Sequence, residues 1–174
     1  MRRRTYGKAV AAGAAAAALL LGGCGDDGGE DGPPSPEDAT GPATVAVESS
    51  PYGDILVGED GYALYMFEAD SPGESACDEA CAEVWPPLTT DGEPNAGDRV
   101  DADLLGTVER TDGTTGVTYN DHPLYYYEPD TEPGDVGGQA VDGFGGLWYV
   151  VGPDGEPIEE ERPEDEATDE PGPY

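Results

Sequence analysis

A short aromatic phrase occurs twice in this chain and constrains its fold more than any other feature. The first copy, LYMFEAD, spans residues 64–70, and the second, LYYYEPD, spans residues 124–130. Each copy contains a tyrosine, any residue, an aromatic side chain, two further residues and an aspartate. A self-match of this kind indicates a duplicated supersecondary unit, so we expect the chain to fold as two related halves.

The match continues on both sides of the phrase. Without a gap, Val57 and Asp60 align with Val117 and Asn120, and further along a tryptophan follows each copy. We expect repeat one to cover about residues 44–90 and repeat two about residues 104–155. The shared motif residues are Tyr65, Phe67, Asp70 and Trp85 in repeat one, and Tyr125, Tyr127, Asp130 and Trp148 in repeat two.

The local pattern of the repeats is that of β-hairpins. Residues 54–68 contain two β-rich runs around Asp60-Gly61, and residues 116–128 repeat this pattern around residues 120–123. Polar turn residues between such runs are a hairpin signal. Further strands are expected at residues 44–48, 104–110 and 146–152. The sequence therefore predicts a mainly β fold, a small single domain built from two tandem β-hairpin repeats.

The repeated phrase has a structural explanation. Strand alternation puts Tyr65 and Phe67 on one face and Leu64 and Met66 on the other, so this strand should be covered on both sides. Tyr125 and its neighbours follow the same pattern. The aspartate that ends each phrase can accept backbone N–H bonds and close a turn. An alternative makes the two aspartates a shared ligand site that faces a common cleft.

The middle of the repeats differs. Repeat one carries SACDEACAEVW at residues 75–85, which predicts a short helix with Ser75 as N-cap, whereas repeat two has a glycine-rich loop at residues 134–146. We favour a structural disulfide between Cys77 and Cys81, because paired cysteines usually bond in an oxidising compartment, to which the N-terminal segment described next would direct the chain. A redox dithiol and a metal site are the alternatives, although the usual redox motif is one residue shorter.

The N-terminus has the form of an export signal. A basic start, MRRRTYGK, precedes a short apolar run and then Cys24. We predict a signal peptide at residues 1–23, lipidation of Cys24 and a disordered acidic linker over residues 24–43. An ordinary signal peptide with a chance cysteine is the alternative, and both the general secretory and twin-arginine routes stay open. Residues 156–174 should form a disordered acidic tail.

The charge balance narrows the possible partners. The chain has 39 acidic and seven basic residues, and four of the basic ones lie in the signal. Without a basic patch the mature chain should not bind nucleic acid, and its charge disfavours flat adsorption to an anionic membrane. Contact with the membrane should come from the N-terminal lipid. An acidic surface suits a basic or cationic partner or an envelope protein, and it also favours solubility.

The motifs taken together resemble those of bacterial secreted-repeat lipoproteins, whose tandem repeats carry Tyr-x-(Phe/Trp/Tyr)-x-x-Asp. LYMFEAD and LYYYEPD match this motif, and SACDEACAEVWPPL and GLWYVVGPDG also fit. The resemblance covers nearly all of residues 44–155. It implies an exported, lipid-anchored protein outside the cytoplasm and of unknown function, and it transfers no catalytic residue.

The sequence contains no nucleophile elbow, phosphate loop or zinc-protease helix. His122 is the sole histidine and lies in the turn sequence NDHP. We therefore expect no catalytic residue, no resident metal and no cofactor. The first hypothesis is a non-catalytic envelope lipoprotein that binds or scaffolds a neighbour. The alternative is a redox or electron-transfer accessory protein that uses the Cys77–Cys81 pair, the Met66 and tyrosine cluster or a bound metal.

Overall fold

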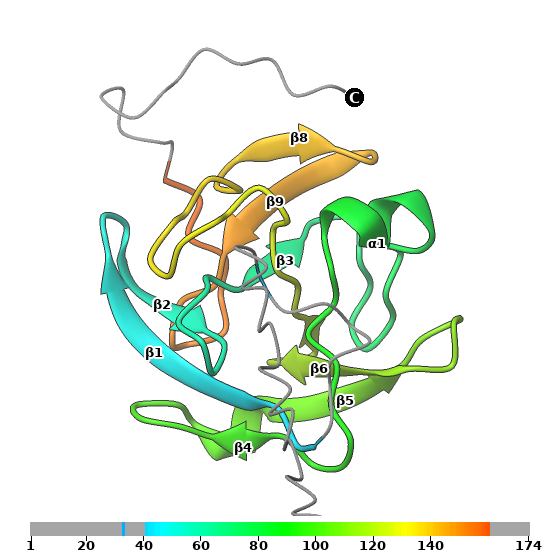
Figure 1. The fold of residues 1–174 in the computed structure, drawn as a ribbon, viewed down its shortest axis with the longest axis horizontal. Coiled ribbons are helices and arrows are strands. Elements are labelled where there is room, and N and C mark those ends of the chain that lie inside the picture. The colour runs from blue at the N-terminus through cyan, green and yellow to red at the C-terminus, as the bar shows by residue number, and fades with distance from the viewer. Residues whose placement is uncertain (1–32, 34–40, 161–174) are drawn as a thin grey trace, which may run out of the picture.

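Nine short strands and one α-helix make up the regular structure of the residues that this computed structural model describes, Pro33 and residues 41–160. The predominance of strands confirms the expected mainly β class (Figure 1). The predicted signal peptide, Cys24 and the far C-terminal tail lie outside the described residues. Within the described range, no helix is long and apolar enough to cross a membrane.

The elements are joined by connections of unequal length, the longest of which, residues 124–140, lies between β7 and β8. In order they are β1 (Thr44–Ser50), β2 (Gly53–Val57), β3 (Tyr65–Phe67), α1 (Ala80–Val84), β4 (Asn95–Ala96), a 3₁₀ turn (Ala102–Leu104), β5 (Leu105–Glu109), β6 (Thr115–Tyr119), β7 (His122–Pro123), β8 (Val141–Gly143) and β9 (Gly146–Val150). They form three small sheets with the orders β2-β1-β4, β3-β9-β8 and β5-β6-β7.

Each repeat begins with an antiparallel strand pair, β1 with β2 and β5 with β6. In repeat two, Tyr119 pairs with His122 across a two-residue turn. Asn120 and Asp121 adopt positive φ angles of 50° and 65° there. Asn and Asp tolerate this left-handed conformation better than most residues, which is why this dipeptide can make so tight a hairpin turn.

The corresponding hairpin of repeat one is one residue longer. The N–H of Leu124 bonds to the carbonyl of Val117, and in repeat one the N–H of Leu64 bonds to the carbonyl of Leu56. Val117 is therefore equivalent to Leu56, and the ungapped alignment with Val57 is wrong upstream of the turn. The extra residue lies in the loop after β2, where the Gly58 N–H bonds to the Tyr62 carbonyl.

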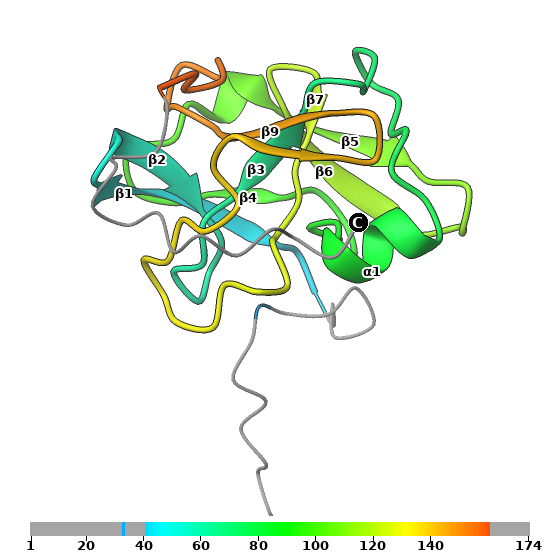
Figure 2. The same ribbon diagram turned by 90° about the horizontal axis from the view of Figure 1, so that it is seen from above.

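The final strand of repeat two belongs structurally to repeat one. Figures 1 and 2 show β9 beside β3, and these strands are antiparallel with Phe67 opposite Trp148. Beyond β9, the Val151 N–H bonds to the Leu64 carbonyl at 3.3 Å, and the Leu56 N–H bonds to the Val151 carbonyl at 2.8 Å. Val151, at the end of repeat two, thus bonds to both strands of the repeat-one hairpin, at Leu56 and Leu64. We call this gap between the two strands of a hairpin its fork.

Repeat one makes the equivalent backbone hydrogen bonds to the hairpin of repeat two. The Leu88 N–H bonds to the Leu124 carbonyl at 2.9 Å, and the Val117 N–H bonds to the Leu88 carbonyl at 2.8 Å. At the centre, Tyr65 and Tyr125 exchange both backbone hydrogen bonds, at 2.8 and 3.0 Å. These equivalent bonds relate the two repeats by an approximate two-fold axis that passes between the two tyrosines.

The core on this axis is a stack of four aromatic rings taken alternately from the two repeats. The centroids of Trp85 and Trp148 are 3.9 Å apart with an interplanar angle of 3°. Phe67 stacks on Trp148 at 4.2 Å, and Tyr127 lies against Trp85 at 4.2 Å. Tyr65 meets the Trp85 ring edge-on. Such stacked and edge-on pairs add stability beyond the area they bury.

A second apolar cluster covers the other face of the central strands. It includes Leu64, Met66, Leu124 and Tyr126, while Tyr65 belongs to the aromatic cluster. The alternation in the repeated phrase predicts this two-sided burial. Both faces of each central strand are thereby removed from water, which explains why the first four positions of the phrase are all aliphatic, Met or aromatic residues.

The folded region extends beyond the predicted boundary at residue 155. The buried Gln139 side chain donates to the carbonyls of Ile158 and Glu160, at 2.6 and 2.8 Å, and accepts the Val150 N–H. Ile158 also packs against the aromatic cluster. Residues 156–160 are therefore part of the domain, because Gln139 supplies backbone partners that the local composition does not reveal.

Truncating either stacked tryptophan should strongly destabilise the domain. Trp85→Ala and Trp148→Ala each remove a fully buried ring, and such truncations cost about 3–5 kcal/mol of unfolding free energy. The measurement is chemical denaturation of the parent and both variants. Phe144→Asn is the matched control, because Phe144 is 42% exposed and has a positive φ of 57° that asparagine tolerates. Equal loss in the control and the tryptophan variants would contradict the stack's central role.

Candidate functional site

The motif residues meet in two hydrogen-bonded pairs that cross between the repeats. The Tyr65 hydroxyl of repeat one donates to Asp130 Oδ2 of repeat two at 2.6 Å. The Tyr125 hydroxyl of repeat two donates to Asp70 Oδ2 of repeat one at 2.8 Å. Each tyrosine can therefore be buried without leaving its hydroxyl unsatisfied, but only when the other repeat is in place.

The second oxygen of each carboxylate holds the loop of its own repeat. Asp70 Oδ1 accepts the Ala76 N–H at 2.6 Å, and Asp130 Oδ1 accepts the Gly137 N–H at 2.9 Å. Both oxygens of both aspartates thus accept bonds from protein donors. The residues that the structure describes contain no group of three or more His, Cys, Asp or Glu side chains arranged to hold a metal ion.

Burial sets the protonation of these groups. It raises the pKa of Tyr65 well above its ordinary value, and the negative charge of Asp130 raises it further. The pKa of Tyr125 is raised for the same reasons, by burial and by the charge of Asp70. Burial also raises the pKa of Asp70 itself, although the bond from the Ala76 N–H opposes the change. Both hydroxyls therefore remain neutral donors at physiological pH.

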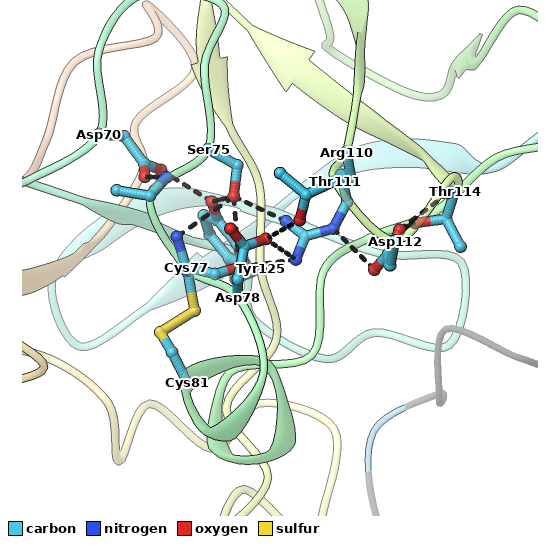
Figure 3. A network of polar contacts seen from close by, with 11 residues as sticks. Asp70, Ser75, Cys77, Asp78, Cys81, Arg110, Thr111, Asp112, Thr114 and Tyr125 are labelled. Atoms are coloured by element: carbon cyan, nitrogen blue, oxygen red, sulfur yellow. Dashed lines mark hydrogen bonds and ion pairs between the residues drawn. A yellow bond between two sulfur atoms is a disulfide. The ribbon is translucent and has the colours of Figure 1, made fainter.

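The Asp70 side of the centre continues into a polar network that includes Ser75, Tyr125 and Arg110 (Figure 3). The Ser75 hydroxyl lies 2.7 Å from the Tyr125 hydroxyl. The buried guanidinium of Arg110 donates to Ser75 Oγ at 2.7 Å and to the Cys77 carbonyl at 2.6 Å. Arg110 thus fixes the chain that leads from Asp70 towards α1.

Two carboxylates balance the buried Arg110 charge. Asp78 and Asp112 lie 3.6 and 3.4 Å from its nitrogens. The Thr111 hydroxyl donates to Asp78, and Thr114 donates to Asp112 through both its hydroxyl and its N–H. The Thr114 hydroxyl, and to a smaller extent Arg110, holds the pKa of Asp112 below its ordinary value. A buried cation needs such partners, because leaving it unpaired would be strongly destabilising.

Cys77 and Cys81 form a disulfide, with their Cα atoms 5.2 Å apart. The helix is shorter than the sequence predicts: α1 begins at Ala80, and Ser75 is not its N-cap. The Ser75 hydroxyl is used instead by Arg110 and Tyr125, and the Cys77 carbonyl accepts from Arg110. These bonds hold residues 75–78 outside the helix, so Cys77 bonds to the helix from its N-terminal side.

Several residues at the centre had no signal in the repeat alignment. Arg110 is one; its clue is that it ends a β-rich run in a domain with very few cations. Gly138 is another, because a Cβ there would lie 2.8 Å from ring atoms of both Trp85 and Tyr65.

The repeats also differ at their tryptophans. The Trp148 N–H donates to the Gly143 carbonyl, whereas the buried Trp85 N–H has no hydrogen-bond partner among residues 41–160.

The crossed pairs should show energetic coupling between the repeats. Tyr65→Phe or Asp130→Asn alone disturbs a buried hydrogen bond and should cost roughly 1–3 kcal/mol. In a double-mutant cycle this pair should couple by about 0.5–3 kcal/mol. The control cycle combines Tyr65→Phe with Asp70→Asn, which belong to the same repeat and share no bond. Its effects should add, and stronger coupling within a repeat than across the repeats would contradict the observed pairing.

Asp70 should favour folding more at low pH than at neutral pH. Because its folded pKa lies above the ordinary value of 3.8, the folded protein binds the proton at a higher pH than the unfolded chain does. This contribution is complete below 3.8 and is lost as the pH rises through the folded pKa. Asp70→Asn removes the titration and keeps an oxygen for the Ala76 N–H. Relative to this variant, the melting midpoint of the parent should rise as the pH falls; parallel profiles would contradict it.

Comparison with known proteins agrees with the duplicated architecture. A family model described as a secreted repeat of unknown function matches the chain twice, over residues 46–89 and 106–152. The two matches contain the two halves of the crossed centre. No curated protein and no solved structure matches the chain.

Proposed function

Because the chain belongs to the family of secreted repeats of unknown function, we propose that it is a lipid-anchored, non-catalytic scaffold of the bacterial envelope that presents an acidic surface to a partner. The family description places the repeats outside the cytoplasm. The observation that carries the proposal is the crossed centre. There the repeated tyrosines and aspartates bond to one another, so the most distinctive residues of the sequence serve to hold the domain together.

The surface supports a binding role through charge. Positions 41–160 contain two arginines, Arg99 and Arg110, and no lysine, and both arginines are engaged with carboxylates. Arg110 is buried, while Arg99 pairs with Asp54 at 2.7 Å. The remaining exposed charge over this region is that of aspartates and glutamates. Such a surface favours a basic or cationic partner, or an envelope protein with a basic face, and disfavours an anionic membrane.

The anchor is supported by the sequence Leu21-Gly22-Gly23-Cys24, which lies outside the described residues. A lipid on Cys24, followed by an acidic linker, would hold the domain near the membrane while its charge keeps the folded part off the surface. The two features therefore combine into one arrangement, a tethered domain that faces its partner and not the lipid.

The redox alternative would need sulfur atoms that another thiol can reach. Cys77 is 0% and Cys81 5% exposed, and the disulfide packs in the aromatic cluster beside Trp85. Thiol–disulfide exchange requires direct attack on a sulfur atom, so this burial favours a structural bond. The short loop that it closes would contribute about 2 kcal/mol in the chain-entropy description.

Replacing the lipidated residue should release the protein from the membrane. Cys24→Ser removes the acylation site, and the variant should leave the membrane fraction and appear in the soluble extracytoplasmic fraction. Cell fractionation followed by immunodetection makes the measurement. Cys77→Ser/Cys81→Ser is the matched control, because it also replaces cysteine by serine and leaves the anchor intact. A Cys24→Ser protein that stays with the membrane as the parent does would overturn the anchor.

The parent protein extracted from the membrane tests the scaffold role against the redox role. As a scaffold it should contain no visible chromophore and no stoichiometric metal, and alkylation without reduction should label neither Cys77 nor Cys81. An absorbance spectrum, metal analysis and intact mass provide these three readouts. A bound chromophore, a stoichiometric metal or two freely labelled thiols would replace the proposal with the redox alternative.

A further inference from the structure

The central contacts of this domain join repeat one to repeat two, and each repeat supplies what the other lacks. We propose that the repeats are self-complementary binding partners, so that two copies of the chain can pair by exchanging whole repeats. The partner is a second copy of this chain. In the exchanged dimer there are two folded units, which we call lobes, and each lobe combines repeat one of one copy with repeat two of the other. The inference does not depend on the lipid anchor.

The first step is the reciprocity of the strand contacts. Val151 of repeat two fills the fork between Leu56 and Leu64, and Leu88 of repeat one fills the fork between Val117 and Leu124. Without its partner, each hairpin would leave these backbone N–H and carbonyl groups unpaired in an apolar setting. Such groups are costly to bury unpaired, so an isolated repeat has a ready-made strand-binding fork.

The second step is that the side-chain contacts are equally mutual. The aromatic stack alternates between repeats, with Trp85 and Trp148 in its centre. The Tyr65 and Tyr125 hydroxyls each bond to a carboxylate of the other repeat. Each tryptophan is stacked on both sides by rings of the other repeat, so an unpaired repeat would expose both faces of its tryptophan and leave its tyrosine without an acceptor. Another repeat of the complementary kind satisfies both needs.

The third step is that the covalent connection takes little part in this interface. The disulfide joins Cys77 to Cys81 within repeat one. After β4, the Val47 N–H bonds to the Asp98 carbonyl, while the Asp101 N–H bonds to the Tyr119 hydroxyl in repeat two. The chain thus passes from one repeat to the other over residues 99–101, and the same contacts would form if the halves came from different copies.

The crossover itself has a feature that favours exchange. Arg99 has a φ of 62°, in the left-handed region that an arginine seldom occupies. Opening the connection between the repeats would release this strained conformation. Strained short hinges promote exchange of identical elements between copies. Within one chain the high effective concentration of the partner repeat favours the closed monomer, so exchange should increase with protein concentration.

Complementation between two damaged full-length chains tests the proposal. One variant carries Tyr65→Ala/Trp85→Ala, with both lesions in repeat one, and the other carries Tyr125→Ala/Trp148→Ala, the equivalent lesions in repeat two. Each variant alone should lack the cooperative unfolding transition of the parent, because it has lost one central tryptophan of the stack and one tyrosine of the crossed pairs. The disulfide is kept oxidised throughout, so that folding differences come from the lesions alone.

Co-refolding of an equimolar mixture at high concentration should restore folding. Exchange places an undamaged repeat one beside an undamaged repeat two in one lobe of a heterodimer, while both lesions fall in the other lobe. The transition should reappear at the parent's midpoint with up to half of the parent's amplitude per chain, because one lobe in two is intact. Differently tagged chains should also co-elute at the mass of a dimer.

A matched mixture distinguishes exchange from general rescue by concentration. Tyr65→Ala/Trp85→Ala is mixed with Phe67→Ala/Trp85→Ala, so that all lesions lie in repeat one and no intact lobe can form; this mixture should stay unfolded. If a double variant alone still folds, adding Phe67→Ala or Tyr127→Ala to the respective repeat removes a further ring of the stack. A complementary mixture that stays unfolded where the parent refolds would overturn the proposal.

Discussion

The stacking of Trp85 on Trp148 is the contact on which the rest of the domain depends. It lies on the approximate two-fold axis, and each ring comes from a different repeat. Phe67 and Tyr127 extend the stack at its two ends. Beside the stack, the Tyr65 hydroxyl donates a hydrogen bond to Asp130. Both repeats therefore contribute to the centre of a single core. Removing one repeat would open the middle of the core, whereas in a chain of independent modules it would only shorten the protein.

Tyrosine is an unusual choice for the centre of a core, and the crossed carboxylates explain it. A phenylalanine would be buried there at lower cost, but it could not select a partner. The Tyr125 hydroxyl reaches Asp70 only when the repeats are in register, and Asp70 in turn holds the Ala76 N–H. The polar pairs therefore link the geometry of the interface to the geometry of each loop, at the cost of desolvating a carboxylate.

The sequence reveals the local structure of this fold better than its assembly. Alternating apolar positions predict the two-sided burial around Tyr65, and the polar residues 120–123 predict a turn after β6, which the structure confines to Asn120 and Asp121. Periodicity is a property of one segment, so it does not show that β9 pairs with the other repeat's β3. The sequence pattern also does not predict the polar network around Arg110 or the hydrogen bonds of the Gln139 side chain. Both depend on backbone carbonyls that are far away in the sequence. The helix prediction extended too far because Ser75 has tertiary partners that compete with capping.

The pair of indoles also gives the molecule an optical signature of its own. Trp85 and Trp148 are the chain's two tryptophans, and their rings lie parallel with centroids 3.9 Å apart. Transitions of chromophores held this close mix, so the tryptophan contribution to the circular dichroism of the folded protein comes from the pair and not from either ring alone. A chain whose strands had formed but whose halves had not met would show ordinary, uncoupled tryptophan spectra. Spectroscopy can therefore follow the joining of the halves separately from the formation of secondary structure.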